Sequence, residues 1–324
     1  MPYNLNDLLV IGITSRALFD LDEADAVFKR EGIEAYREHQ RLRERDILAL
    51  GTGFSLVENL LRINDQVQEP VVEVVVISRN DADSGIRILN SIEAHGLGIT
   101  RAAFTDGRPP WPYLKAFDCD LFLSAEREDV EQALRNNRPA ALVLKTGSRS
   151  KGSELDSEVR IAFDGDAVLC DHESEHVYQT RGLEAFNRRE AELAEVPLSP
   201  GPFKPFLDSL ARIQRKFPAE KSPIRLALVT SRAAPAHRRV VNTLRQWGIR
   251  LNETFFLGGV DKSGVLAAFK PHIFFDDQLT HLETAQANTP SAHVVPVTAQ
   301  PVLPFDEVGP ALGEPASKSA DEVA

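Results

Sequence analysis

Cysteine is scarce in this chain of 324 residues, which contains only Cys119 and Cys170. Two cysteines provide no disulfide framework, so we expect a protein of a reducing compartment. No stretch approaches the ~20 apolar residues of a membrane span, and the N-terminus lacks the basic start and cleavage site of a secretory leader. These absences predict a cytoplasmic protein that has no membrane segment.

Basic residues are in the minority. Lys and Arg together number 37 and Asp and Glu 48, for a formal net charge of −11 at pH 7. This excess of acids argues against a broad surface for nucleic acid, so a nucleic-acid partner is not expected, although local basic patches stay open. What the chain does contain is 43% hydrophobic and 26% charged residues, the balance of folded globular proteins. Its length suits one large domain or two ordinary ones.

An internal repeat organises the sequence. Residues 32–36 (GIEAY) return at 182–186 (GLEAF), and 87–92 (RILNSI) return at 239–244 (RVVNTL), shifts of 150 and 152 residues. Single residues match in the same order at these shifts: Gly51 and Leu60 with Gly201 and Leu210, and Gly96, Phe104, Gly107, Phe117 and Phe122 with Gly248, Phe256, Gly259, Phe269 and Phe274. We therefore predict a duplication over about residues 8–125 and 158–280.

Each copy alternates continuous apolar runs with amphipathic, helix-like stretches. The apolar runs lie at 8–13, 71–77, 121–123 and 140–144, and at 159–163, 224–229 and 273–275. This alternation predicts an α/β fold with Rossmann-like parallel sheets and helices on both faces. Helical stretches over 23–43 and 175–193 follow the first strand of each copy, and Gly96 and Gly248 are expected to end helices.

The repeat also sets the expected domains. Residues 1–144 form a first half, 145–157 (polar, rich in Gly and Ser) a linker, and 158–300 a second half. A helical cap is expected within the second half at about 171–222. Residues 304–324 carry Pro, Gly, Ser and acids without apolar periodicity, so we expect them to be disordered.

Acidic residues follow two strands of the second half. Asp164 and Asp166 come directly after its first strand, and Asp276 and Asp277 directly after its third. A single Asp at a strand end is often only a turn former or helix N-cap. Parallel strands, however, bring their carboxyl ends to one edge, where two carboxylates ~4 Å apart repel by roughly 4 kcal/mol at an effective dielectric of about 20. The cluster predicts a cation, and oxygen ligands without Cys or His suit Mg²⁺.

Other polar residues are expected at the same edge. Thr230, Ser231 and Arg232 follow the second strand of this half, and Lys262 follows a Gly-Gly turn. The sequence therefore predicts that a hydroxyl and a lysine converge with the acids.

These residues occur in the order of a known family's motifs. FDGDAV at 163–168 resembles the first motif of the haloacid dehalogenase-like phosphohydrolases, Thr230 the second, Lys262 the third, and Asp276-Asp277 the fourth. More narrowly, AFDGDAVL, PHIFFDDQ and SRALFD resemble the cytosolic 5′-nucleotidase I group, over about residues 8–297. One departure is the segment HVVP from His293, where that group has His-Val-Pro-Tyr-Gly, so a contact made by that Tyr is expected to be missing.

The resemblance implies a Mg²⁺-dependent 5′-nucleotidase that hydrolyses nucleoside 5′-monophosphates. Asp164 would form an aspartyl-phosphate and Asp166 would act as general acid and then base. Mg²⁺ would be held by Asp164, the Asp166 carbonyl, and Asp276 or Asp277. Thr230 and Lys262 would hold the phosphoryl oxygens.

The first half lacks this chemistry. At the repeat shifts, Asp164, Asp166, Asp276 and Asp277 correspond to Thr14, Arg16, Ser124 and Ala125. We expect this half to be catalytically inactive and to lend groups to the substrate pocket. The candidate substrate-binding residues are Ser231 and Arg232 in the second half and Ser78, Arg79, Asn80 and Lys115 in the first. The alternative, that the first-half residues are ordinary loop and surface groups, stays open.

Two other functions remain open at this point. One is a phosphatase for another small phosphomonoester, such as a sugar phosphate, and the other is a nucleotide-binding regulatory protein with little turnover. The sequence leaves open the base and sugar preference, allosteric regulators and the subunit number, a homo-oligomer included.

Overall fold

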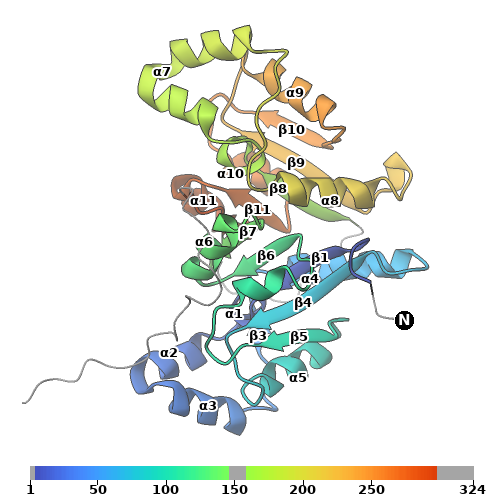
Figure 1. The fold of residues 1–324 in the computed structure, drawn as a ribbon, viewed down its shortest axis with the longest axis vertical. Helices are drawn as coiled ribbons and strands as arrows, with labels where there is room; N and C mark the ends of the chain where they lie inside the picture. Colours follow the sequence, from blue (N-terminus) through green and yellow to red (C-terminus); the bar gives the residue numbers. More distant parts are fainter. Residues whose placement is uncertain (1–3, 146–157, 298–324) are drawn as a thin grey trace, which may run out of the picture.

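One ten-stranded β-sheet runs through the molecule, in the strand order β10-β9-β8-β11-β12-β7-β6-β1-β4-β5 (Figure 1). The computed structural model describes residues 4–145 and 158–297. The expected tail at 304–324, and the expected linker apart from Lys145, lie outside these described residues. Within the described ranges, no helix combines the length and apolar character that a membrane crossing needs.

The strands of each half are parallel to one another and follow the same spatial order. The first half supplies β1 (Leu9–Ile13), β4 (Val72–Ser78), β5 (Arg101–Phe104), β6 (Leu121–Ser124) and β7 (Ala140–Val143). The second supplies β8 (Val159–Phe163), β9 (Ile224–Thr230), β10 (Glu253–Phe256), β11 (Ile273–Asp276) and β12 (Ser291–His293). The halves join through the antiparallel pair β12–β7. The predicted α/β class is confirmed, with a mixed, mostly parallel sheet.

Every apolar run of the sequence is a strand, because central strands are covered on both faces and need apolar residues throughout. All seven residues of β4 are buried, for example. The edge strands β5 (RAAF) and β10 (ETFF) are only partly buried and carry polar residues. For that reason neither strand was predicted from the sequence. The buried β12 (SAH) was not predicted either, because three residues are too few to form an apolar run.

The helices follow the predicted alternation with one change. They are α1 (Ser15–Leu18), α2 (Asp22–Glu31), α3 (Ile33–Leu42), α4 (Phe54–Leu61), α5 (Ile86–Ala94), α6 (Arg127–Arg135), α7 (Glu173–Glu192), α8 (Lys204–Gln214), α9 (His237–Gln246), α10 (Ser263–Phe269) and α11 (Leu279–Ala285). The helix expected at 23–43 is broken into α2 and α3 at Gly32, and α7 bends at Gly182, with φ of 86° and 79°. Gly96 and Gly248 follow α5 and α9 at φ of 72° and 65°, as predicted for helix stops.

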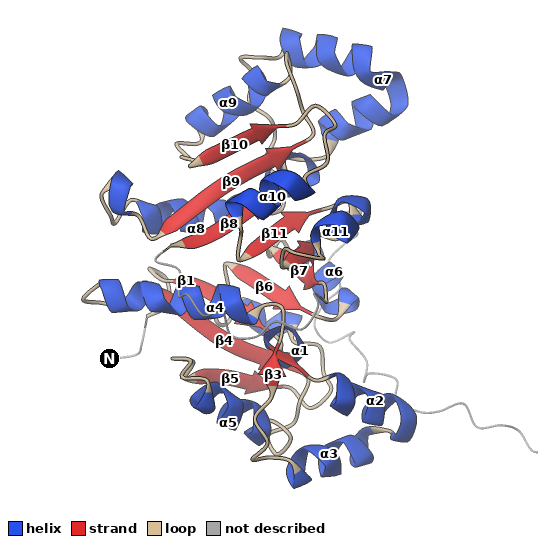
Figure 2. Ribbon diagram, turned by 180° about the vertical axis from the view of Figure 1, so that it is seen from behind, coloured by secondary structure: helices blue, strands red, loops and turns tan. Residues whose placement is uncertain are grey.

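Shorter elements complete the chain. They are the two-stranded ribbon of β2 (Phe19–Asp20) and β3 (Ala49–Leu50), the 3₁₀ turns η1 (Arg62–Gln66), η2 (Trp111–Leu114) and η4 (Ala219–Lys221), and the π turn η3 (Gly165–Leu169). In Figure 2 the arrowheads of β9 and β10 and those of β4 and β5 point to the same side of the molecule. The bent α7 and the α2–α3 pair project on that side, at opposite ends of the sheet (Figure 2).

Helices α4 and α8 lie side by side across the junction of the halves (Figure 2). Helix α8 contacts β1 of the first half as well as β9, and α4 contacts β8 of the second half as well as β4. Phe203 and Phe206 are fully buried against Phe163 and Phe275. Helix α8, which falls inside the range expected for a cap, thus belongs to the core that both halves share.

Several hydrogen bonds recur in both halves at the repeat shifts of 150 and 152 residues. The pairs are Arg87 Nη1 to Gln40 Oε1 (3.0 Å) and Arg239 Nη1 to Glu190 Oε1 (2.8 Å); Leu48 N to Ser91 Oγ (3.0 Å) and Leu198 N to Thr243 Oγ1 (2.9 Å); Asn90 Nδ2 to Glu44 O (2.8 Å) and Asn242 Nδ2 to Ala194 O (3.0 Å). Side chains at corresponding positions therefore form equivalent hydrogen bonds in the two halves.

Gly201 packs directly against backbone, so a side chain there should destabilise the fold. A Cβ at this position would lie 2.3 Å from the Cys170 carbonyl oxygen and 2.5 Å from that of Val168. We expect Gly201→Ala to lower the free energy of unfolding by about 1–3 kcal/mol, measured by urea denaturation. The control is Gly264→Ala in α10, where a Cβ meets nothing within 4 Å and helix propensity predicts a gain of about 0.5–1 kcal/mol. Equal effects of the two changes would contradict this account.

Candidate active site

The carboxyl ends of β8, β9 and β11 bring the predicted site residues to one edge of the sheet. β8 pairs with both β9 and β11, so Asp164, Thr230 and Asp276 stand on neighbouring strand ends. Carboxylate oxygens of Asp164, Asp276 and Asp277 lie within 4.8 Å of one another. Three of the four acids that the sequence predicts to converge therefore do so, and Asp166 does not join them.

Lys262 neutralises part of this acidic cluster. Its Nζ donates to Asp164 Oδ1 at 2.6 Å and to Asp276 Oδ2 at 2.7 Å. The side chain stands at the start of α10 and is almost fully buried. The preceding turn uses Gly258 and Gly259 at φ of 58° and 90°, which glycine adopts without steric cost.

Burial dominates the electrostatics of the acids. It raises the pKa of Asp164 to about 7, although the charge of Lys262 acts in the opposite direction. It raises the pKa of Asp277 to about 8, and the neighbouring acids add to that shift. For Asp276, burial is outweighed by hydrogen bonds from His281 and Lys262, so its pKa lies below the usual value. The protein alone therefore disfavours full ionisation of the cluster.

The donor set fits a hard divalent cation. In the part of the chain that the structure describes, Asp277 Oδ1 is buried and has no hydrogen-bond partner. Both oxygens of Asp276 accept hydrogen bonds, Oδ1 from the Gln278 backbone N–H at 2.8 Å and Oδ2 from Lys262. A buried carboxylate oxygen without a partner is costly, and Mg²⁺ among oxygen ligands would remove that cost.

Asp166 lies outside the three-acid cluster and faces a different partner. Arg232 donates to it through two nitrogens, Nε to Oδ2 at 2.8 Å and Nη2 to Oδ1 at 2.6 Å. The turn η3, which carries Asp166, is irregular because Asp166 and Ala167 depart from helical geometry. Arg232, predicted as a substrate-binding residue, is 5% exposed and engaged by protein carboxylates, whereas Ser231 beside it is exposed.

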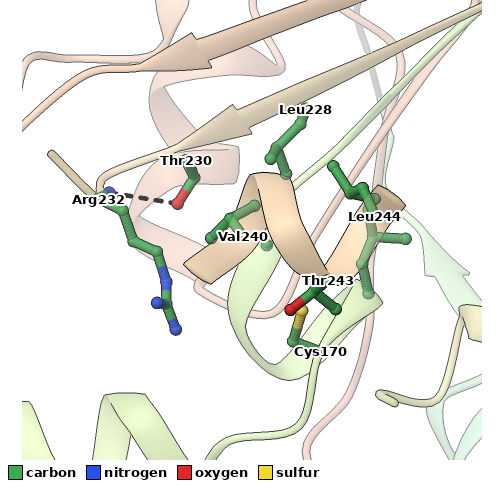
Figure 3. Close-up of a pocket in the computed structure, with 9 residues that line it drawn as sticks. Cys170, Leu228, Thr230, Arg232, Val240, Thr243 and Leu244 are labelled. Carbon is green, nitrogen blue, oxygen red and sulfur yellow. Dashed lines mark hydrogen bonds between the residues drawn. The ribbon is translucent and has the colours of Figure 1, made fainter. Parts of the chain in front are cut away.

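Thr230 Oγ1 accepts a hydrogen bond from the Arg232 backbone N–H at 3.2 Å (Figure 3). Figure 3 also shows a cavity beside these residues, lined by apolar side chains that include Leu228, Val240 and Leu244. Its volume is about 10 Å³, roughly one water molecule. A nucleotide does not fit this cavity, so it is not the substrate pocket.

The first-half candidates have partners within their own half. Ser78 Oγ lies 2.8 Å from Ser15 Oγ, and Asn80 Nδ2 donates to the Tyr36 hydroxyl at 2.8 Å. Arg79 pairs with Asp129 and Lys115 is exposed. The described contacts thus do not join Ser78, Arg79, Asn80 or Lys115 to the acidic cluster, and their role in substrate binding stays a prediction.

Several polar residues around the site, most of them buried, were not predicted as site residues from the sequence. Glu190 and Arg239 contact each other behind Arg232, His281 Nδ1 lies 3.1 Å from Asp276 Oδ2, and His293 Nε2 lies 2.8 Å from the Asp277 carbonyl oxygen. The repeat contained a signal for the first two, since Gln40 and Arg87 stand at the matching positions. His293 begins the HVVP segment noted in the sequence, whereas no comparable signal marked His281.

The pKa of Asp277 makes a prediction for the metal-free protein. The native state holds a proton on Asp277 up to about pH 8, which the unfolded chain releases near pH 3.9, so in chelator this group costs stability as the pH rises between these values. Asp277→Asn carries no charge. We therefore expect the free energy of unfolding of Asp277→Asn to exceed that of wild type by about 1–3 kcal/mol at pH 8 in chelator, and by less at pH 5.

Chemical denaturation at both pH values measures this difference, and added Mg²⁺ is the control. Mg²⁺ should stabilise the wild type more than Asp277→Asn, because the variant has lost a ligand. Equal stabilisation of both proteins, or no gain for the variant in chelator at pH 8, would contradict the assignment.

Comparisons with known proteins place this site in a family. A family model described as 5′-nucleotidase matches residues 1–300. Cytosolic 5′-nucleotidase 1B of Homo sapiens is 37% identical over 296 residues, which cover 88% of this chain and 48% of that protein. The chain thus spans about half the length of this curated relative, and no solved structure matches it. With a family match over nearly its whole length, the chain belongs to the 5′-nucleotidase family.

Proposed function

We propose that the chain is a Mg²⁺-dependent 5′-nucleotidase that hydrolyses nucleoside 5′-monophosphates to nucleoside and phosphate. Family membership supports the reaction and the substrate class. The observation that carries the chemistry is the convergence of Asp164, Asp276, Asp277 and Lys262 at one sheet edge. Such a set can attract a divalent cation and a phosphoryl group together.

Asp164, Asp277 and the Asp166 carbonyl are the proposed metal ligands. Asp277 is favoured over Asp276 as the direct carboxylate ligand because its Oδ1 has no partner among the described residues, whereas both oxygens of Asp276 are engaged. When bound, Mg²⁺ would offset the repulsion between the anionic nucleophile and the phosphate. Asp276 would then fix Lys262 beside Asp164.

The reaction proceeds in two displacements at phosphorus. The Asp164 carboxylate attacks and forms a bond to phosphorus while the bond to the 5′-oxygen breaks, and Asp166 gives that oxygen its proton. Asp166 then takes a proton from water, whose oxygen attacks the aspartyl-phosphate and releases phosphate and the Asp164 carboxylate. Lys262 and Thr230 hold the phosphoryl oxygens in both steps. Lys262 also favours the ionised form of Asp164 that attack requires.

We infer that the two halves derive from one duplicated unit. The shared strand order, the bends at Gly32 and Gly182, and the recurring hydrogen bonds support this history. Residues 1–144 would be the inactive half, 158–300 the catalytic half, and α7 the part of the expected cap that projects beyond the sheet. A homo-oligomer and a cytoplasmic location, the latter in keeping with the relative's name, complete the proposal.

A substrate panel tests the proposed activity. Initial rates of phosphate release are measured on nucleoside monophosphates and on sugar phosphates, with Mg²⁺ and then with chelator. We expect turnover of at least one nucleoside monophosphate to exceed that of the sugar phosphates by about tenfold or more, a difference of ~1.4 kcal/mol in transition-state binding, and to stop in chelator. Comparable rates on sugar phosphates would favour a general phosphatase, and tight nucleotide binding without turnover would favour a regulatory protein.

The nucleophile is tested by Asp164→Asn, which keeps the shape of the side chain and removes its charge. We expect phosphate release to fall by at least about a thousandfold, because an amide cannot replace the attacking carboxylate, while circular dichroism stays unchanged. The matched controls are Thr14→Ala and Ser124→Ala, the positions in the first half that correspond to Asp164 and Asp276, which should change turnover little. Retained activity in Asp164→Asn would show that the nucleophile is misassigned.

A further inference from the structure

Arg232 and Glu190 form a buried ionic link behind Asp166. Arg232 uses Nε and Nη2 for Asp166, and its remaining nitrogen, Nη1, donates to Glu190 Oε2. A guanidinium that grips two carboxylates through separate edges is fixed in orientation, and it fixes theirs. The position of Asp166 therefore depends on a residue 24 positions away in sequence, on α7.

Glu190 is held from three elements. Its Oε1 accepts hydrogen bonds from Ser174 Oγ at 2.9 Å and from Arg239 Nη1 at 2.8 Å, and its Oε2 accepts from Arg232. Ser174 belongs to the first arm of α7 and Glu190 to the second, on either side of the bend at Gly182, while Arg239 belongs to α9. The carboxylate thus ties both arms of the projecting helix to the loop that carries Asp166.

The charges in this link balance. Two guanidiniums, Arg232 and Arg239, face two carboxylates, Asp166 and Glu190, and the side chains of all but Asp166 are at least 95% buried. Burial alone lowers the pKa of Arg232, but the charges of Asp166 and Glu190 outweigh burial and raise it. Removal of one carboxylate would leave an excess positive charge beside Asp166 in a poorly solvated place.

The first half provides a comparison within the same molecule. At the matching positions it has Arg16 for Asp166, Asn80 for Arg232 and Gln40 for Glu190, while Arg87 corresponds to Arg239 and still contacts Gln40 at 3.0 Å. A neutral Gln is therefore sufficient for this contact between two helices, α3 and α5 in the first half. Only the half that contains Arg232 and Asp166 has a charged residue, Glu190, at this position. The charge of Glu190 is therefore not required for the helix contact alone.

We propose that Glu190, acting through Arg232, is a positioning residue for Asp166. Glu190 holds the guanidinium so that Asp166 is oriented for proton transfer. It also balances part of the positive charge of Arg232, which Asp166 would otherwise balance alone. Arg232 is then a second positioning residue rather than a group that binds substrate. This inference rests on the proposed function, in which Asp166 protonates the leaving 5′-oxygen.

Substrates with different leaving groups distinguish this positioning role from a role in general support of the fold. A nucleoside 5′-alkoxide is a poor leaving group and needs a proton from Asp166, whereas p-nitrophenolate is a stable anion that leaves without one. Loss of acid catalysis therefore slows the first step on a nucleotide far more than on p-nitrophenyl phosphate. A loosened site would slow both.

The experiment compares wild type and Glu190→Gln in Mg²⁺, with release of nucleoside and of p-nitrophenolate measured in the first turnover. We expect nucleoside release to fall by about a hundredfold, the lower range of general-acid contributions, and p-nitrophenolate release by less than about threefold. Gln40→Glu, the reciprocal change in the first half, is the matched control and should alter neither rate. Equal losses on the two substrates in Glu190→Gln would overturn the proposal.

Thermal denaturation checks that Glu190→Gln is folded. If it is not, Ser174→Ala replaces it, since this change removes one neutral hydrogen bond from Glu190 and keeps the charges. A smaller loss with the same selectivity for the nucleotide is then expected, and an unselective loss contradicts the proposal. A wild type without nucleotide turnover would refute the proposed function itself, whereas an active wild type with an unselective Glu190→Gln would refute only the positioning role.

Discussion

Repulsion among Asp164, Asp276 and Asp277 is the constraint on which the site depends. Three carboxylates, with oxygens within 4.8 Å of one another, are held together at the ends of buried strands. Lys262 compensates one charge by contacting two of them. Burial, to which the neighbouring carboxylates add, raises the pKa of Asp164 and Asp277. This edge of the sheet therefore favours positive charge. Either binding of a divalent cation or protonation of one of the acids relieves the repulsion.

The two halves show what this constraint requires of the surrounding structure. In the first half the matching strand ends carry Thr14 and Ser124, whose hydroxyls accept hydrogen bonds from backbone N–H groups. Neutral groups need no cation, so that half is satisfied by local hydrogen bonds. In the second half the acids need Lys262 at one side and Arg232 at the other. The same scaffold therefore accommodates either arrangement, and the charges decide which chemistry it supports.

Much of this arrangement could be predicted from the sequence, because continuous apolar runs mark central strands and acids directly after them must meet at one edge. The edge strands β5 and β10 could not, since their half-exposed residues lack an apolar signal. Nor could the partner of Arg232. Its place after β9 suggested an outward, substrate-facing side chain, but the direction is set by Glu190, which lies 42 residues earlier and meets it only in the folded chain. Side-chain orientation is decided by tertiary partners that local sequence does not specify.

The first half also supports the site mechanically. Helix α4 packs against β8, the strand that Asp164 directly follows, while α8 of the second half packs against β1. Ser209 of α8 donates to Asp120 at 2.6 Å, and Arg212 donates to the Leu8 carbonyl oxygen at 3.1 Å. Polar as well as apolar contacts therefore hold α8 against the first half. Separation of the halves would expose apolar faces on both sides of the junction, at a cost proportional to the area uncovered. The strand that leads into Asp164 therefore rests on the half whose matching strand ends, at Thr14 and Ser124, carry no acids.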